Sequence, residues 1–362
     1  MRHALILAGG SGTRLWPYST AALPKQLVPL LQGRSLLDIA VRRATSVVPP
    51  SRVWLGAGEQ LRAAVSQVEG LQADRLVVEP SGRDTLPAVA LGCAVIAAAD
   101  PSAVVAVLTA DHLIEPLDSF AATLDAAFAL AEARADALVT FGVVPDSAAT
   151  GFGYLELGDP LADGGHVVSC FREKPTLSVA SDFLAAGPSR YLWNSGMFVW
   201  QAATLLRAVD AFVPQSAPVL REMGLAYGTS AWDDLARDAW PSLAKLSIDY
   251  GVLEPASTAP DFTVAALPLA ARWLDVGSWP AYGQAVGADE DGNMVGAARA
   301  VLHASRGNVV ASSEPDHLVT LVGCEGLVVV HTPSATLVMP AADAQRVKEL
   351  HARVVEVAPE LA

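Results

Sequence analysis

The sequence predicts an α/β protein, with an open and mostly parallel sheet followed by a small β-rich domain. Short apolar runs alternate with helical segments from residue 4 to residue 142, which is typical of a parallel sheet with helices on both faces. A glycine-rich loop follows the first apolar run, and ligands of such sheets bind at the carboxyl ends of strands. From Asn293 onward, short alternating runs of valine, alanine and glycine predict the β-rich part.

The first half of the chain predicts a regular succession of strands and helices. Ser35 can cap the helix after the glycine loop, because Asp38 stands at the distance of a capping box. Arg42 and Arg43 in that helix are expected to face outward. The expected strands cover 4–8, 52–56, 75–79, 102–109 and 137–142, and the expected helices cover 35–48, 59–68, 84–99 and 118–133.

Beyond Gly142 the pattern changes. Segments 151–157 and 166–172 alternate like hairpin strands, and helices are expected at 176–185, 202–212 and 229–237. The β-rich part has expected strands at 300–303, 308–312, 317–322, 327–331 and 336–339, then a helix from 341 to about 353. Because 283–293 is polar and contains glycine, we predict domains at 1–285 and 286–362.

The composition limits the partners. Of 362 residues, 52% are hydrophobic and 17% are charged. A chain of this length and hydrophobic content can build one large and one smaller core. The formal net charge of −14 disfavours nucleic acid and anionic membranes as partners, and no basic run contradicts this. The most apolar segment, 86–99, contains Pro87 and Gly92 and is too short to span a membrane, so a buried helix is expected.

The cysteines and the N-terminal residues indicate in which cellular compartment the protein is expected. Cys93, Cys170 and Cys324 are widely separated and have no metal-binding spacing, so we expect buried thiols in a reducing compartment. The apolar run before the first glycines is too short for the core of a signal peptide. A cytoplasmic protein is predicted.

The glycine loop predicts a site for a phosphorylated ligand. Gly9, Gly10 and Gly12 allow backbone N–H groups to approach an anion, and Arg14 and Lys25 can neutralise its phosphates. The loop lacks the third small residue of a dinucleotide fingerprint, and no Gly-Lys-Ser/Thr of a P-loop occurs in the chain. A plain β-turn is the alternative for the glycines alone.

Lysine is scarce in this chain. Only four of the 24 basic residues are lysines, and both Lys25 and Lys174 stand beside a proline. A compact ammonium suits point contact with a phosphate, whereas arginine suits a bidentate fork. These two lysines are therefore candidates for phosphate contacts, although chance placement explains either one alone.

Two aspartates are candidates for a divalent cation. Asp111 follows the valine-rich strand 102–109, and Asp275 lies in the segment WLDVGSW. Carboxylates together with phosphates and water are the usual ligands of Mg²⁺. A helix cap for Asp111 and a turn for Asp275 are the alternatives, and nothing in the spacing brings the two together.

The arrangement GGSGTRLWP with PKQ downstream resembles the signature of the sugar-nucleotide pyrophosphorylases, and most closely that of bacterial mannose-1-phosphate guanylyltransferases. That family makes GDP-mannose and pyrophosphate from GTP and mannose 1-phosphate with Mg²⁺. The resemblance implies a Rossmann-like, GT-A-like nucleotidyltransferase domain with a mostly parallel sheet. It also implies that the C-terminal domain is a short left-handed β-helix, where periodicity alone shows only strands.

The resemblance extends to residues that would act on the nucleotide. LTADH at 108–112 and DVGSW at 275–279 resemble family loops whose aspartates hold catalytic Mg²⁺, so Asp111 and Asp275 are the expected metal ligands. Arg14 and Lys25 would neutralise the triphosphate. The residues expected to bind the nucleotide are Leu7, Ala8, Gly9, Gly10, Gly12, Thr13, Glu79, Asp84 and Thr85.

The sugar side also resembles the family. GFGY at 151–154, FREKP at 171–175 and LWNSGMF at 192–198 match its acceptor motifs, and SIDYGVLE at 247–254 is a further branch marker. The resemblance implies that Glu173 and Asn194 bind sugar hydroxyls, that Gly153 lets the backbone approach the sugar, and that Lys174 holds its phosphate. A surface ion pair is the alternative for Glu173 and Lys174.

The chain departs from the family pattern near the base. EPSGRDTLPA at 79–88 has Asp84 where the family has Asn, and Leu86 where it has Ala. An ionised Asp only accepts hydrogen bonds, so it could pair with guanine N1–H and N2–H₂ or could repel the nucleotide. Thr109 in place of Pro and Pro255 in place of Lys are milder departures.

The leading hypothesis is therefore an enzyme that forms GDP-mannose with Mg²⁺ as cofactor. Another sugar 1-phosphate, such as that of a manno-heptose or fucose, would use the same hydrogen-bonding residues. A non-catalytic paralogue that senses nucleotide sugars is a third hypothesis, kept open by Asp84 and Thr109. The expected partners are GTP and mannose 1-phosphate, without nucleic acid or membrane, and a homodimer is one option for the oligomeric state.

Overall fold

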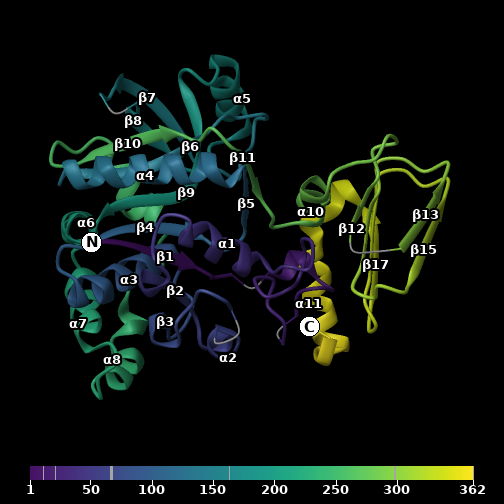
Figure 1. The fold of residues 1–362 in the computed structure, drawn as a ribbon, viewed down its shortest axis with the longest axis horizontal. Coiled ribbons are helices and arrows are strands. Elements are labelled where there is room, and N and C mark those ends of the chain that lie inside the picture. The colour runs from purple at the N-terminus through teal and green to yellow at the C-terminus, as the bar shows by residue number, and fades with distance from the viewer. Residues whose placement is uncertain (11, 21, 66–67, 163, 297–298, 362) are drawn as a thin grey trace. The chain divides into compact units, whose positions relative to one another are not determined.

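The computed structural model describes residues 1–10, 12–20, 22–65, 68–162, 164–296 and 299–361, and its contacts divide the chain into two compact units (Figure 1). Unit 1 contains Met1–Gly9, Val41–Thr109 and Glu115–Ala271. Unit 2 contains Gly10–Ala40, Ala110–Ile114 and Arg272–Ala362. The predicted division into domains 1–285 and 286–362 is a different description of the chain and stays a prediction.

Unit 1 is built on a nine-stranded mixed sheet. The strands in sheet order are β3 (Leu76–Glu79), β2 (Val53–Gly58), β1 (Arg2–Leu7), β4 (Val104–Thr109), β9 (Tyr191–Gln201), β6 (Ala137–Val143), β10 (Thr263–Pro268), β8 (His166–Arg172) and β7 (Tyr154–Pro160). The first four run parallel, whereas β9 runs antiparallel to β4, β6 and β7. The carboxyl ends of β1, β2 and β3 therefore lie at one edge of the sheet.

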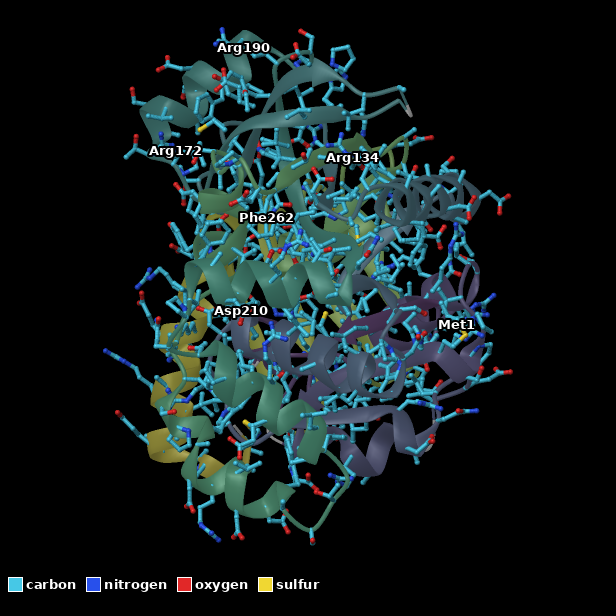
Figure 2. The ribbon with its side chains drawn as sticks, turned by 90° about the vertical axis from the view of Figure 1, so that its left-hand side faces the viewer. Met1, Arg134, Arg172, Arg190, Asp210 and Phe262 are labelled. Atoms are coloured by element: carbon cyan, nitrogen blue, oxygen red, sulfur yellow. The ribbon has the colours of Figure 1, made fainter. Side chains whose placement is uncertain are left out.

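The helices of unit 1 cover this sheet. They include α2 (Arg62–Val65), α3 (Thr85–Ala99), α4 (Leu117–Ala133), α5 (Leu177–Ala186), α6 (Ala202–Phe212), α7 (Ala217–Ala226), α8 (Trp232–Asp238) and α9 (Glu254–Ala256), and α1 (Leu36–Thr45) enters the unit at Val41. Helix α3 is buried from Leu86 to Ile96. A Cβ at Gly92 would collide with the side chain of Leu5, so the glycine lets α3 lie directly on β1. Met1, at the opposite end of β1 from the glycine loop, pairs its ammonium group with Asp100 at 3.2 Å (Figure 2).

Unit 2 contains the β-rich C-terminal part. Strands β12 (Met294–Gly296), β14 (Val309–Ser312), β16 (Leu327–His331) and β17 (Thr336–Pro340) form one sheet, and β13 (Arg299–His303) pairs with β15 (Leu318–Val322). The ladders β12–β14, β14–β16 and β13–β15 are parallel, as in a coil of stacked turns. Helix α10 (Trp279–Val286) precedes these strands in the chain, and helix α11 (Val347–Val357) follows them. Strands β5 (His112–Glu115) and β11 (Arg272–Asp275) form a separate two-stranded sheet.

The predicted α/β class with a β-rich C-terminal part is confirmed, and most predicted elements lie within a few residues of the observed ones. The prediction missed β5, β9, β10, β11, β12, α7, α9 and α10, and segment 59–68 is helical only in short stretches among its described residues. The capping box is present, because Ser35 Oγ accepts from the Asp38 N–H at 3.0 Å and Asp38 accepts from the Ser35 N–H at 3.0 Å.

One prediction about α1 is wrong. Arg42 is exposed, but Arg43 is buried, and its guanidinium donates a hydrogen bond to the Thr109 carbonyl. The same guanidinium lies 5.5 Å from the centre of the Phe120 ring. The side chain is buried because it satisfies a backbone acceptor at the end of β4, which the periodicity of α1 could not reveal. Cys93 is buried as predicted, whereas Cys170 and Cys324 are half-buried, and all three thiols are free.

No helix among the described residues is both long and apolar enough to cross a membrane.

Candidate active site

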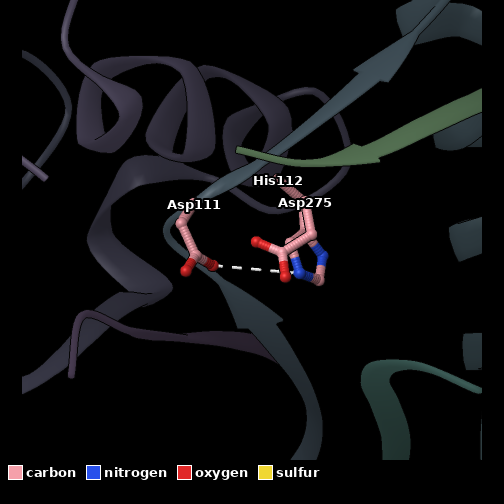
Figure 3. A group of neighbouring side chains, drawn as sticks. All are labelled: Asp111, His112 and Asp275. Carbon is pink, nitrogen blue, oxygen red and sulfur yellow. Dashed lines mark ion pairs between the residues drawn. The ribbon is translucent and has the colours of Figure 1, made fainter. Parts of the chain in front are cut away.

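The pairing of β5 with β11 brings the two predicted metal ligands together. Asp111 directly precedes β5, Asp275 is the last residue of β11, and the Val276 N–H donates to the Asp111 carbonyl at 3.1 Å. One carboxylate oxygen of each aspartate and a ring nitrogen of His112 lie within 4.8 Å of one another (Figure 3). Residues 164 positions apart in sequence thus form one group, although the spacing alone gave no sign of it.

Lys25 completes this group. Its ammonium is 2.6 Å from Asp111 Oδ2, and its side chain is buried, with 9% exposed. Burial raises the pKa of Asp111, but the charge of Lys25, its hydrogen bond and other contributions together outweigh burial and bring that pKa to about 2. Asp111 is therefore ionised at neutral pH. We call Lys25, Asp111, His112 and Asp275 the metal cluster.

The glycine loop is shaped around Lys25. Gly12 has φ +63, and a Cβ there would lie 2.8 Å from the Lys25 side chain, so both the backbone and the close approach require glycine. Gly10, with φ +94, is also in the left-handed region. The Ser19 hydroxyl donates to the Gly12 carbonyl at 2.6 Å, and Thr13 begins a short 3₁₀ turn. The predicted positions Gly10, Gly12 and Thr13 thus lie beside the metal cluster in unit 2.

Arg14 lies next to the other aspartate loop. A Cβ at Gly277 would be 3.4 Å from the Arg14 guanidinium and 3.1 Å from Asp275 Oδ1, which places all three groups side by side. Arg14 Nη1 also donates to Gln345 Oε1 at 3.4 Å. All four residues predicted as catalytic therefore lie in unit 2, where Arg14 is exposed and Lys25 is buried.

The metal cluster fits a magnesium ion. Asp111 and Asp275 offer hard carboxylate oxygens from two neighbouring strands, and Mg²⁺ is commonly bound by one or two carboxylates that leave positions for phosphate and water. The donor set therefore suits the expected metal.

The other predicted nucleotide residues lie in unit 1, at the end of β1 and from the end of β3 to the start of α3, with β2 between the two strands. Leu7 ends β1, and the Ala8 N–H donates to the Gly56 carbonyl at 2.8 Å, which extends the sheet toward Gly9. Glu79 ends β3 at the same edge and is half-buried. Burial raises the pKa of Glu79 to about 7, so this carboxyl is partly protonated near neutral pH.

Asp84 and Thr85 form the beginning of α3. Asp84 caps the helix, and its carboxylate accepts from the Thr85 N–H at 2.8 Å with φ 67 and ψ −176. The Thr85 hydroxyl accepts from the Ile248 N–H at 2.9 Å. Asn and Asp both cap helices and have side chains of nearly the same shape, so the replacement of the family's Asn leaves this local structure intact.

The four predicted sugar-phosphate residues lie together in unit 1. A Cβ at Gly153 would lie 2.6 Å from Glu173 Oε2, and the Gly153 carbonyl accepts from the Asn194 N–H at 2.8 Å. Lys174 Nζ is 3.1 Å from Glu173 Oε1. Glu173 and Asn194 are buried, with exposed fractions of 9% and 6%, so the alternative of a surface ion pair does not describe Glu173.

Two residues that the sequence reasoning did not select complete this group. Asn194 Nδ2 donates to Asp249 Oδ1 at 2.9 Å, and Asn194 Oδ1 accepts from the Thr140 hydroxyl at 2.7 Å. Asp249 begins a π-helical turn, Asp249–Leu253, and such turns are frequent at functional sites. Its position in the branch marker SIDYGVLE was the available signal, whereas Thr140 gave none. We call Thr140, Gly153, Glu173, Asn194 and Asp249 the acceptor cluster.

The acceptor cluster is rich in carboxylates. Burial, and next the charge of Glu173, raise the pKa of Asp249 to about 7. Burial also raises the pKa of Glu173, and its hydrogen bond with Lys174 opposes this only in part. Burial lowers the pKa of Lys174, but its hydrogen bond with Glu173, the charge of Glu173 and other acidic groups nearby together raise it above the ordinary value. The cluster thus offers several acceptors and has the Lys174 ammonium beside it, a set suited to a polyol that carries a phosphate.

Two family models match most of the chain. Residues 3–292 match the family model described as Nucleotidyl transferase, and residues 298–354 match the MannoseP isomerase/GMP-like beta-helix domain. A crystal structure from Thermus thermophilus, described as mannose-1-phosphate geranyltransferase, has a TM-score of 0.85 and 32% identity. It covers 98% of this chain and 99% of that one.

Curated relatives align along nearly the whole chain. The mannose-1-phosphate guanylyltransferase of Escherichia coli K12 is 33% identical over 96% of this chain and 72% of its own length. The xanthan biosynthesis protein XanB of Xanthomonas campestris pv. campestris is 33% identical over 97% of this chain and 72% of its own length. The chain therefore belongs to the nucleotidyl transferase family, among the mannose-1-phosphate guanylyltransferases with a β-helix domain.

Proposed function

We propose that this guanylyltransferase joins mannose 1-phosphate to the GMP part of GTP, releasing pyrophosphate and GDP-mannose. The acceptor phosphate attacks the α-phosphorus, and the bond from that phosphorus to the bridging oxygen of pyrophosphate breaks. The observation that carries the proposal is the grouping of Lys25, Asp111 and Asp275, in a chain whose relatives are guanylyltransferases. No covalent enzyme intermediate is needed, because the acceptor phosphate is itself the nucleophile.

The residues of unit 2 serve the triphosphate in this proposal. Asp111 and Asp275 would hold Mg²⁺, which spreads the negative charge of the phosphates when it is bound. Arg14 and Lys25 would contact phosphate oxygens, and Gly10, Gly12 and Thr13 would let backbone N–H groups reach them. Transfer of this kind depends mainly on positioning and electrostatic stabilisation.

The residues of unit 1 serve the base and the sugar. Leu7, Ala8, Gly9, Glu79, Asp84 and Thr85 would bind the guanosine part. Glu173 and Asn194 would accept and donate hydrogen bonds to mannose hydroxyls, Gly153 would let the backbone approach the ring, and Lys174 would hold the sugar phosphate. The buried acceptors support this, because Thr140, Asp249 and Lys174 already hold them in place, and their oxygens can each accept a further hydrogen bond from a sugar hydroxyl.

Product identification tests the sugar. GTP and Mg²⁺ are incubated with the 1-phosphates of mannose, a manno-heptose, fucose and glucose, and nucleotide sugars are identified by mass spectrometry. GDP-mannose as the main product is expected. A preference for another sugar would keep the chemistry and overturn the acceptor, and binding of GDP-mannose without turnover would indicate a sensing protein.

A cytoplasmic location and a homodimer belong to the proposal as well. Fractionation of cells that express a tagged chain tests the first, and sedimentation velocity of the purified chain tests the second.

A further inference from the structure

His112 and Trp273 form a hydrogen-bonded pair at the edge of the metal cluster. Trp273 Nε1 donates to His112 Nδ1 at 3.1 Å, with ring centres 5.0 Å apart and planes at 77°. The two residues lie on the paired strands β5 and β11. His112 is buried, with 7% exposed, and its Nε2 is 3.8 Å from Asp111 Oδ1. The dashed line in Figure 3 joins these two side chains.

The direction of this hydrogen bond fixes the hydrogen on the imidazole. An indole N–H can only donate, so His112 Nδ1 must offer a lone pair. A neutral imidazole carries one hydrogen, which must then be on Nε2. This is the nitrogen that faces Asp111, so the ring presents an N–H to the carboxylates and has no lone pair there for a cation.

We propose that Trp273 holds His112 in its Nε2–H form, so that His112 turns an N–H and not a lone pair toward the carboxylates of the metal cluster and is not itself a metal ligand. The cluster then offers a cation only oxygen atoms, a donor set that favours Mg²⁺ or Mn²⁺ over Zn²⁺. His112 is thus a positioning residue that acts through Asp111 and Asp275. This inference rests on the proposed metal site.

Loss of the Trp273 indole should allow the hydrogen on the His112 imidazole to move to the other nitrogen. In Trp273→Phe, His112 can carry its hydrogen on Nδ1 and turn the Nε2 lone pair toward the aspartates. One nitrogen and two oxygens are a set that zinc accepts readily. The variant should therefore gain Zn²⁺ affinity relative to Mg²⁺. Trp232→Phe is the matched control, because Trp232 packs on Tyr227 in unit 1.

The first test needs no metal. The ¹⁵N resonances of His112 are assigned in the metal-free protein by their loss in His112→Gln. We expect Nδ1 to resonate as a lone-pair nitrogen and Nε2 as an N–H nitrogen in the wild type and in Trp232→Phe, with this preference lost in Trp273→Phe. An Nδ1–H form in the wild type overturns the proposal, and this test stands even if Trp273→Phe fails to fold.

The second test loads the protein with Mn²⁺ and uses electron spin echo modulation to detect directly bound ¹⁴N. We expect none in the wild type, and direct ¹⁴N coupling there overturns the proposal. By titration, His112→Ala should bind Mn²⁺ about 10–100-fold more weakly, and His112→Gln, which keeps an N–H donor, should recover most of this loss. Equal losses in both variants would exclude the donor role. An absence of Mn²⁺ binding, with the Nε2–H form intact by NMR, would instead refute the metal site of the proposed function.

Discussion

The acceptor cluster and the metal cluster differ in how their side chains are held. In the acceptor cluster, Asn194 is held on both sides by Thr140 and Asp249, at 2.7 Å and 2.9 Å. In the metal cluster, the contact between Lys25 and Asp111 joins two groups that would both act on the same phosphates and cation. Neutral and charged hydrogen bonds therefore fix the side chains of the acceptor cluster in advance. The metal cluster instead holds opposite charges that can each bind part of a charged ligand.

This difference matches the ligands that we propose for the two clusters. A sugar carries neutral hydroxyls that need donors and acceptors in fixed places, so rigidity supplies specificity. A triphosphate with its cation brings strong charges, so the protein needs matched charges more than a fixed hydrogen-bond pattern. Changes in the metal cluster should mainly affect turnover, whereas changes in the acceptor cluster should mainly affect use of the sugar.

The largest effect is expected for Asp111→Asn. The substitution removes one negative charge from the metal site and leaves buried Lys25 without its carboxylate partner. Pyrophosphate release should fall by at least about 100-fold, and the melting temperature should fall as well, because Lys25 is then buried and unpaired. Asp316→Asn, at an exposed position in the same unit, should retain wild-type activity and serves as the control. Unchanged turnover in Asp111→Asn would refute the metal assignment.

A smaller and more selective effect is expected for Asn194→Ala. It removes the amide between Thr140 and Asp249, and with it a predicted contact to the sugar. The value of kcat/KM for mannose 1-phosphate should fall about 10–100-fold, while KM for GTP should change little. Steady-state kinetics with each substrate varied in turn measures both. An equal rise of both KM values would remove the distinction between the two clusters.

Asp249→Asn tests the electrostatics of the acceptor cluster through stability. The pKa of Asp249 is about 7 in the folded protein against 3.8 for the ordinary group, so the folded state keeps a proton that the unfolded chain loses. This carboxyl therefore lowers stability progressively as pH rises from about 4 to about 7. Asn keeps an oxygen that can accept from Asn194 and carries no charge. The difference in melting temperature between the variant and the wild type should be a few degrees more favourable to the variant at pH 8 than at pH 5. A larger advantage of the variant at pH 5 would contradict the assignment.

The smallest effect is expected for Asp84→Asn, which restores the residue of the family pattern. Asp84 already caps α3 through the Thr85 N–H, and Asn can make the same bond. The KM for GTP should therefore change less than about tenfold, which corresponds to less than about 1.4 kcal/mol. A larger change, measured with GTP and ATP side by side, would show that the carboxylate itself selects the base.

The sequence predicted the features of the fold that depend on residues close together in the chain. The alternation of apolar runs located β1–β4, and the capping box at Ser35 and Asp38 formed as expected. Strand β9 was missed because its central residues were interpreted only as an acceptor motif. Arg43 was placed outward because its partner, the Thr109 carbonyl, is distant in sequence.

Residue types and motifs in the sequence selected the candidate site residues, but they did not show which of these residues contact one another. Asp111 and Asp275 were selected separately, and only the pairing of β5 with β11 joins them. Thr140 lies in a strand without a distinctive motif, and its role depends on a side-chain bond to Asn194. His112 was passed over for a related reason, since a histidine acquires a defined hydrogen position only from its partner, here Trp273.

The most direct test of the proposed activity is pyrophosphate release in the presence of Mg²⁺. GTP, ATP, UTP and dTTP are each supplied with and without mannose 1-phosphate, and initial rates are compared. We expect release only from GTP together with mannose 1-phosphate, and its loss on chelation of the metal. Release with a different nucleotide would contradict the guanine assignment, and no release from any pair would contradict the proposed reaction.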